Sequence, residues 1–329
     1  MTVQLVGDEL LPPAPSPPRR HLISIADLTR EDVQRLLATA RSFEQSLDRE
    51  VKKLPTLRGR TVVNLFFESS TRTSSSFELA AKRLSADTMV LRASGSSVDK
   101  GESLRDTALT LAAYDPDVIV IRHPHIGASQ LVAAATEAHV INAGDGKHQH
   151  PTQALLDLHT IRDALGRLDG VTVAIVGDVL HSRVARSLVE ALLLVGAEPV
   201  LIAPPTLLPR NVEALGAKVS HSIDPLADVD VVYVLRMQAE RMEASYVPSL
   251  REYTALYGVT PDRVRPGQVV MHPGPMNRGV EIDPRVADSG ASLVTTQVRS
   301  GLVVRMAVLY DLLTAPGLHV APVPVMEVA

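Results

Sequence analysis

The sequence predicts an α/β protein with two doubly wound parallel-sheet domains and the active site in the cleft between them. Runs with strand character alternate with helical patterns through both halves of the chain. Residues 117–121 form a nearly continuous β-branched run, which is typical of a strand buried on both faces of a parallel sheet. The chain has 329 residues, which is long for one core, so we expect two domains of about 150 residues.

The first half of the chain shows this alternation clearly. Apolar residues between Val33 and Phe43 recur at i, i+3, i+4 and i+7, which predicts a helix within residues 25–47. The elements expected after it are a strand over 61–67, a helix over 74–84, a strand over 88–91, a polar loop over 94–101, a helix over 102–114, a strand over 117–121, a helix over 127–138, a strand over 140–142, a turn over 144–146 and a helix from His150.

A second βα series follows. Strands are expected over 171–176, 199–203, 229–235 and 269–271, with helices over about 183–195 and 301–313. These elements place the first domain at residues 21–150 and the second at 151–296, with a helix over about 297–315 that packs back on the first domain. Residues 1–20 are expected to be a flexible leader, because their proline content is too high for a helix.

Composition excludes several classes of function. The formal charge is −4 and aromatic residues make up 3% of the chain, which argues against a nucleic-acid-binding surface. The chain contains no cysteine, so disulfides, thiolate catalysis and the usual zinc clusters are excluded. No apolar run reaches the roughly 18 residues of a membrane helix. We expect a cytoplasmic protein that binds neither nucleic acid nor membrane and uses no metal and no cofactor.

The strongest candidate site is the stretch Glu68-Ser69-Ser70-Thr71-Arg72-Thr73, between a predicted strand and a predicted helix. Backbone N–H groups at a helix start lack intrahelical partners and carry partial positive charge. The hydroxyls of Ser70, Thr71 and Thr73 add donors, and Arg72 adds a fork that fits two phosphate oxygens. The stretch is therefore interpreted as an anion site. The alternative is an ordinary cluster of N-capping residues.

His150 is the second candidate. It follows a glycine-rich turn and precedes a proline at a helix start, which favours a position in the cleft over one in a core. A neutral imidazole there can donate to a carbonyl oxygen as negative charge develops on that oxygen. Gln153 lies three residues further on and shares this helix start. A buried structural histidine is the alternative.

Further basic residues lie near strand ends, namely Arg122, Arg183, Arg236 and Arg241. Each alone is equally compatible with a solvated surface. The triplet Arg236-Met237-Gln238 directly after a buried strand is more specific, because a planar fork beside an amide suits a carboxylate. Lys100 is either a solvated loop tip or a mobile cation that closes over an anion. Residues 173–178 suggest a dinucleotide site but lack its three-glycine spacing.

Three stretches, residues 68–73, 150–153 and 272–275, together with residues 236–238, resemble the aspartate/ornithine carbamoyltransferase family. The resemblance covers residues from about 21 to 315. It implies a carbamoyl phosphate-binding first domain, an aspartate- or ornithine-binding second domain, and a homotrimer with shared active sites. A larger assembly with regulatory or dihydroorotase chains is also known in the family.

The resemblance assigns roles residue by residue. The residues implied to bind carbamoyl phosphate are Ser70, Thr71, Arg72, Thr73, Ser96, Arg122, His150, Gln153, Pro273 and Gly274. Ser96 and Lys100 match a loop that the neighbouring subunit donates. Glu68 resembles a residue that ties the domains together on closure through arginines, matched here by Arg183 and Arg241. Arg72, Thr73, Lys100, Arg122 and His150 match catalytic positions.

The identity of the second substrate is implied by two motifs that differ between members of the family. Ornithine-specific members carry Ser-Met-Gly after the corresponding strand and a cysteine in His-Cys-Leu-Pro. This chain carries Arg236-Met237-Gln238 and His272-Pro273-Gly274-Pro275, and Gly274 departs from members with a bulkier residue there. With Arg183 and Lys100, Arg236 and Gln238 resemble an arrangement that binds L-aspartate. The implied reaction is carbamoyl transfer from carbamoyl phosphate to L-aspartate in pyrimidine biosynthesis. Transfer to ornithine or an acetylated derivative, and a catalytically silent scaffold, are the alternatives.

Overall fold

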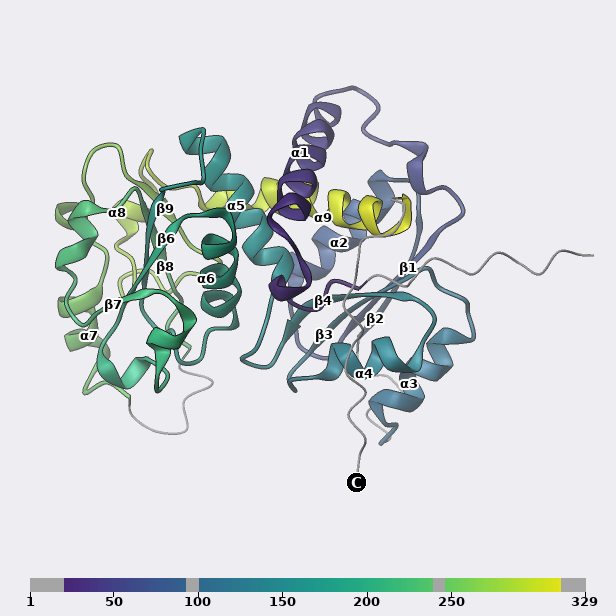
Figure 1. Ribbon diagram of the computed structural model, residues 1–329, viewed down its shortest axis with the longest axis horizontal. Helices are drawn as coiled ribbons and strands as arrows, with labels where there is room; N and C mark the ends of the chain where they lie inside the picture. The colour runs from purple at the N-terminus through teal and green to yellow at the C-terminus, as the bar shows by residue number, and fades with distance from the viewer. Residues whose placement is uncertain (1–20, 93–100, 239–245, 315–329) are drawn as a thin grey trace, which may run out of the picture.

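The computed structural model describes residues 21–92, 101–238 and 246–314, which form two parallel sheets with helices packed around them (Figure 1). The first sheet contains β1 (Thr61–Phe66), β2 (Asp87–Arg92), β3 (Val118–His123) and β4 (His139–Asp145). Its strand order is β2-β1-β3-β4, and all pairs are parallel.

Alternate side chains of this sheet enter two different cores. Val62, Val118 and Val120 belong to one apolar cluster, and Val63 and Ile119 belong to another. Successive side chains of a strand point to opposite faces, so the sheet is apolar on both. The helices of this half of the chain are α1 (Arg30–Leu47), α2 (Thr71–Arg83), α3 (Leu104–Ala112) and α4 (Ala128–Ala135). Full burial of each such side chain stabilises the fold by about 1.5–3 kcal/mol before entropy is counted.

The second sheet follows the same plan. It contains β5 (Thr172–Val176), β6 (Glu198–Ile202), β7 (Lys218–Ser220), β8 (Val231–Val234) and β9 (Val269–Met271), in the order β7-β6-β5-β8-β9 and all parallel. The helices α6 (Arg183–Val195), α7 (Leu250–Tyr257) and α8 (Pro284–Ala287) belong to this half of the chain. The α/β architecture with two doubly wound parallel sheets is confirmed.

Two helices connect the halves. The helix α5 (Pro151–Leu165) runs from the end of β4 toward the second sheet, and it is buried along almost its whole length. The last helix, α9 (Val294–Thr314), leaves the second half and packs on α1, α2 and α5. Figure 1 shows α9 in yellow crossing between the two lobes.

The strand orders locate the crevices. In the first sheet the order reverses between β1 and β3, and in the second between β5 and β8. Ligands of open α/β sheets bind outside the carboxyl ends of strands at such switch points. The residues at or just after the carboxyl ends of these four strands include Glu68, Arg122, Asp178 and Arg236. Two switch points therefore supply polar side chains from separate parts of the chain.

Several predicted boundaries were wrong. The helix predicted from Ser74 begins at Thr71, so the second half of the anion-site stretch, residues 71–73, lies in its first turn. Of the predicted turn over 144–146, the first two residues belong to β4. The last helix, predicted over about 301–313 from its pattern and over about 297–315 in the domain division, begins at Val294, because Thr295, Thr296 and Ser300 hide its apolar face in the sequence.

Three elements were missed altogether, namely β7, α7 and α8. They have three, eight and four residues, and they lack the apolar runs that marked the equally short β9 and α4 in the sequence. Among the described residues, no helix has both the length and the apolar character needed to cross a bilayer.

Candidate active site

A cavity of about 750 Å³ lies where the carboxyl ends of both sheets meet the starts of α2, α5 and α6. Its charged lining residues are five arginines and one glutamate, namely Arg72, Arg122, Arg183, Arg236, Arg305 and Glu68. The protein as a whole is weakly acidic, so this positive charge is local. A cavity with four more cationic than anionic side chains is suited to anionic ligands.

The start of α2 forms one wall. Ser70 is its N-cap residue, but the Ser70 side chain makes no capping hydrogen bond. The Ser70 hydroxyl is therefore not used for capping, and the helix N-terminus lines the cavity with Thr71, Arg72 and Thr73 in its first turn. Partial burial and the nearby charge of Arg236 lower the pKa of Arg72. Two cations held near each other mark a place where an anion binds favourably.

His150 forms the floor beside this wall. It is the N-cap residue of α5, is only 4% exposed, and its backbone N–H donates to Ser187 Oγ at 2.8 Å. Its Nδ1 has no hydrogen-bond partner within the described part of the chain. Burial, followed by the charges of Arg122, Arg305 and Arg183, lowers the pKa of His150 well below 6.5. The imidazole is therefore neutral at physiological pH and can serve as a donor to a ligand oxygen.

Glu68 connects the two halves of the chain. Its Oε2 accepts a hydrogen bond from Arg183 Nη2 at 2.5 Å and lies 3.3 Å from Arg122 Nε. Arg183, at the start of α6, is 4% exposed and also donates to the Gly146 carbonyl at 3.0 Å. The predicted pairing of Glu68 with Arg183 is present. Arg183, predicted to bind an aspartate carboxylate, is already occupied by protein groups in this structure.

The triplet that follows β8 forms the opposite wall. Arg236 and Gln238 line the cavity. The backbone N–H of Gln238 donates to Asp178 Oδ2 at 3.2 Å, and Asp178 Oδ1 lies 2.8 Å from His181 Nδ1. Both members of this pair are buried. Asp178, which belonged to the rejected dinucleotide motif, thus holds the loop that carries the candidate carboxylate site.

The segment after β9 lies against the α2 wall. Gly274 N–H donates to His272 Nδ1 at 2.8 Å, so His272 Nε2 carries the proton and faces Glu281 Oε1 at 3.2 Å. Gly274 has φ +62°, and a Cβ there would lie 2.5 Å from Arg72 Nη1. The glycine therefore permits the close approach of Arg72. Pro273 also lines the cavity.

The structure brings most of the predicted residues together. The predicted residues that line the cavity are Glu68, Ser70, Thr71, Arg72, Thr73, Arg122, His150, Gln153, Arg183, Arg236, Gln238, Pro273 and Gly274. Ser96, Lys100 and Arg241, like the predicted leader over 1–20, lie outside the described residues.

The two polar residues of α9 that line the cavity, Gln297 and Arg305, were missed. Arg305 donates to Ser76 Oγ at 2.8 Å, and its guanidinium lies 5.1 Å from the centre of the Phe77 ring. Burial lowers its pKa to about 10. Arg305 is the single cation within the apolar run of residues 302–309. This was the available signal in the sequence, because burying a charge is costly unless the charge is paired or binds a ligand.

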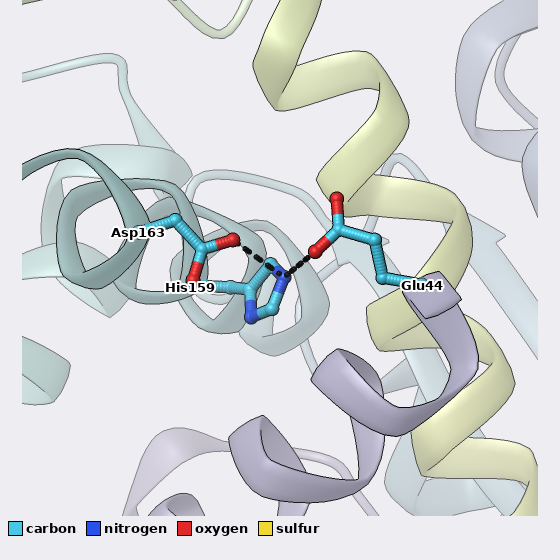
Figure 2. A group of neighbouring side chains, drawn as sticks. All are labelled: Glu44, His159 and Asp163. Carbon is cyan, nitrogen blue, oxygen red and sulfur yellow. Dashed lines mark ion pairs between the residues drawn. The ribbon is translucent and has the colours of Figure 1, made fainter. Parts of the chain in front are cut away.

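One group away from the cavity has the composition of a metal site. Glu44 of α1 and His159 and Asp163 of α5 point toward one another, with their ligand atoms within 4.8 Å (Figure 2). However, Arg41 pairs with Asp163 at 3.0 Å, and Arg299 lies 3.5 Å from Glu44. Because arginines already compensate both carboxylates, we assign no metal to this group.

The comparisons with known proteins agree on one family. Residues 20–163 match the model of the carbamoyl-P binding domain of aspartate/ornithine carbamoyltransferase, and residues 169–312 match that of its Asp/Orn binding domain. The chain is 58% identical over 298 residues to an aspartate carbamoyltransferase catalytic subunit from Thermobifida fusca, covering 89% of this chain and 95% of the relative. It is 54% identical over 302 residues to the one from Pelotomaculum thermopropionicum, covering 91% and 97%.

Solved structures give the same result. The fold is similar to aspartate transcarbamoylase from Trypanosoma cruzi in complex with N-(phosphonacetyl)-L-aspartic acid, with a TM-score of 0.81, 32% identity, and coverage of 89% of this chain and 95% of that one. It is also similar to the catalytic subunit of M. jannaschii aspartate transcarbamoylase, with a TM-score of 0.78, 39% identity, and coverage of 89% and 97%.

Proposed function

The chain belongs to the aspartate/ornithine carbamoyltransferase family, and we infer that it transfers the carbamoyl group of carbamoyl phosphate to the amino group of L-aspartate. The products are N-carbamoyl-L-aspartate and phosphate. The observation that carries this conclusion is the cavity lined by five arginines, because both substrates are anions. The reaction belongs to pyrimidine biosynthesis and takes place in the cytoplasm.

The α2 wall is the phosphate side in this proposal. Ser70, Thr71, Arg72 and Thr73 hold the phosphate with backbone N–H groups, hydroxyls and a guanidinium fork. Arg122 and His150 donate to the carbamoyl oxygen, and Gln153 with the backbone of Pro273 and Gly274 holds the carbamoyl nitrogen. The opposite wall, with Arg183, Arg236 and Gln238, binds the two carboxylates of aspartate.

The mechanism requires no covalent enzyme intermediate. The uncharged amine of aspartate attacks the carbamoyl carbon, and the new C–N bond gives a tetrahedral intermediate with negative charge on the carbonyl oxygen. The neutral His150 and the positive Arg122 stabilise that oxygen. The C–O bond to phosphate then breaks, and the departing phosphate accepts the amine proton. Catalysis comes from holding two anions in reacting contact and from these donors.

The quaternary structure forms part of the proposal. Ser96 and Lys100 complete a neighbouring subunit's site, so the working unit is a homotrimer with shared active sites. The relatives are named catalytic subunits, which supports a larger assembly with regulatory or dihydroorotase chains. Mixing Arg72→Ala and Lys100→Ala subunits should restore activity at about one site in four, because some interfaces then contain both wild-type residues. Mixed trimers that are as inactive as the two parent variants would contradict active sites shared between subunits.

The test of the activity is a side-by-side assay of the purified chain. Carbamoyl phosphate is supplied with either L-aspartate or L-ornithine, and phosphate release and carbamoylated product are both measured. We expect turnover with aspartate and at least a hundredfold lower kcat/KM with ornithine, whose side-chain cation would face Arg236. Equal use of ornithine would reject the assignment of the acceptor, and no turnover with either would favour the silent scaffold.

A further inference from the structure

Asp157 is a buried carboxylate behind the cavity. It accepts hydrogen bonds from Gln153 and Gln297, two residues that line the cavity. It lies on α5, one turn after Gln153, and it is 0% exposed. Its Oδ1 accepts from Gln153 Nε2 at 3.0 Å and from Gln297 Nε2 at 2.8 Å, while its Oδ2 accepts from Tyr233 Oη at 2.7 Å. These three donors come from α5, α9 and β8, so the carboxylate joins elements from both halves of the chain.

The first of these bonds fixes an amide. A glutamine amide has one donor end and one acceptor end. Gln153 lines the cavity, and its donor end is committed to Asp157. The end left for the cavity is the oxygen, which is the group that accepts from a carbamoyl NH₂. If the amide turned over, two acceptors would face each other at Asp157, so the carboxylate enforces this orientation.

The second bond leads to the segment after β9. Gln297 donates through Nε2 to Asp157 and accepts through Oε1 from the His272 backbone N–H at 2.9 Å. His272 Nδ1 in turn accepts from the Gly274 N–H. A continuous set of hydrogen bonds therefore runs from Asp157 to the backbone that lies beside the carbamoyl nitrogen in the proposed function.

We propose that Asp157 is a positioning residue for the carbamoyl group, because its carboxylate orients the Gln153 amide and, through Gln297 and His272, the Pro273–Gly274 backbone. This proposal rests on the proposed function, and it assigns Asp157 no contact with substrate. The phosphate side, built from residues 70–73, lies outside this set of bonds.

Burial makes a carboxylate at position 157 energetically unfavourable. Burial raises the pKa of Asp157 to about 7, although the three hydrogen bonds and Arg305 on α9 act in the opposite direction. From β8, Tyr233 faces the carboxylate, and burial and Asp157 raise the tyrosine pKa well above 10. With a pKa of about 7 the carboxyl group is partly ionised at neutral pH, and the three donors around it favour the ionised form. Burying this group is costly, and its presence is explained if it is needed to hold the amides.

The test compares binding of two ligands by calorimetry, using Asp157→Asn, Asp157→Ala and a control. Carbamoyl phosphate should bind roughly tenfold to a hundredfold more weakly to Asp157→Ala than to wild type. The loss of affinity should be smaller in Asp157→Asn, because asparagine keeps one acceptor oxygen. Inorganic phosphate should bind to both as it does to wild type. Asp163→Asn, the same change on the same helix but outside the cavity, should alter neither affinity.

Two further readouts separate positioning from a structural role. The unfolding temperature of Asp157→Asn should be unchanged or higher than that of wild type, and its KM for aspartate should stay within about twofold. In a Gln153→Ala, Gln297→Ala background, where no amide remains to be oriented, Asp157→Asn should change carbamoyl phosphate affinity by less than about twofold.

Several outcomes would overturn the proposal. These are equal losses for carbamoyl phosphate and inorganic phosphate, a full effect of Asp157→Asn in the double-alanine background, or a fall in unfolding temperature that accounts for the loss of binding. Failure of the proposed function would give a different result, because the wild type would then bind carbamoyl phosphate but would not carbamoylate aspartate.

Discussion

The two sides of the cavity are built in different ways. The proposed phosphate side is one contiguous stretch, residues 70–73, and the structure leaves the Ser70 hydroxyl free of any capping bond. The proposed aspartate side combines Arg183 from α6 with Arg236 and Gln238, which follow β8, and Arg183 is already hydrogen-bonded to Glu68 and Gly146.

This difference suggests an order of events. A site whose groups face the cavity is ready for its ligand, whereas part of the Arg183 guanidinium is already used by protein acceptors, so a substrate carboxylate competes there with Glu68 and Gly146. In the proposed function, the phosphate side is therefore more preorganised than the aspartate side. The following predictions test this contrast, starting with the largest expected effect.

Removal of the guanidinium on the preorganised side should have the largest effect. Arg72→Ala should lower kcat/KM by roughly a hundredfold or more, because the fork stabilises the departing phosphate. Steady-state kinetics with carbamoyl phosphate as the varied substrate measures this change. Lys82→Ala on the same helix, whose ammonium pairs with Glu78 outside the cavity, is the control and should match wild type. An Arg72→Ala enzyme with near wild-type kcat/KM would show that the phosphate does not bind at this wall.

The second prediction concerns the opposite wall. Arg236→Ala should raise the KM for aspartate by about tenfold to a hundredfold, because a charge-assisted bidentate contact is lost, while carbamoyl phosphate binding stays intact. Kinetics gives the first quantity and calorimetry the second. Arg251→Ala on α7 removes an exposed arginine of the same half of the chain and serves as the control. An unchanged KM for aspartate would reject the assignment of Arg236.

The third prediction tests the contact between Gly274 and Arg72 of the α2 wall. An alanine Cβ there would displace the Arg72 guanidinium, so Gly274→Ala should weaken inorganic phosphate binding by about threefold to tenfold. The positive φ adds a cost of about 1–2 kcal/mol in stability. Gly127→Ala carries the same strain at φ +85° but meets open space, so it should lose stability without losing phosphate affinity. Equal phosphate affinity in both variants would show that Arg72 needs no room there.

The smallest expected effect concerns His150, which lies between the two sides. Its pKa in the folded protein lies well below 6.5, so the unfolded state binds one more proton as the pH falls through 6.5. Wild type should then lose about 1.4 kcal/mol of stability per pH unit relative to His150→Gln, in which this group is absent. Denaturant unfolding of both proteins between about pH 5 and pH 7 measures this difference. Parallel pH profiles would mean that the imidazole is not held neutral.

The same contrast explains what could be predicted from sequence. The phosphate side was visible because one strand end and one helix start carry its groups in consecutive positions. The membership of Arg183 and Arg236 in one site followed from the family resemblance, since residues 53 positions apart carry no local signal of proximity. Asp157 and Gln297 were missed because polar residues on buried helices have no period of their own, and their partners are set only by tertiary packing. The elements β7, α7 and α8 were missed because they are short and carry no apolar run like those of β9 and α4.

The central claim is that one cavity holds two anions side by side, and a single ligand that spans both sides tests it most directly. N-(phosphonacetyl)-L-aspartic acid, which is bound in the Trypanosoma cruzi structure, joins a phosphonate to aspartate. Calorimetric titration should give one ligand per site, bound at least a hundredfold more tightly than inorganic phosphate, with weaker binding in both Arg72→Ala and Arg236→Ala. Binding no tighter than phosphate, or loss in only one of the two variants, would contradict the claim.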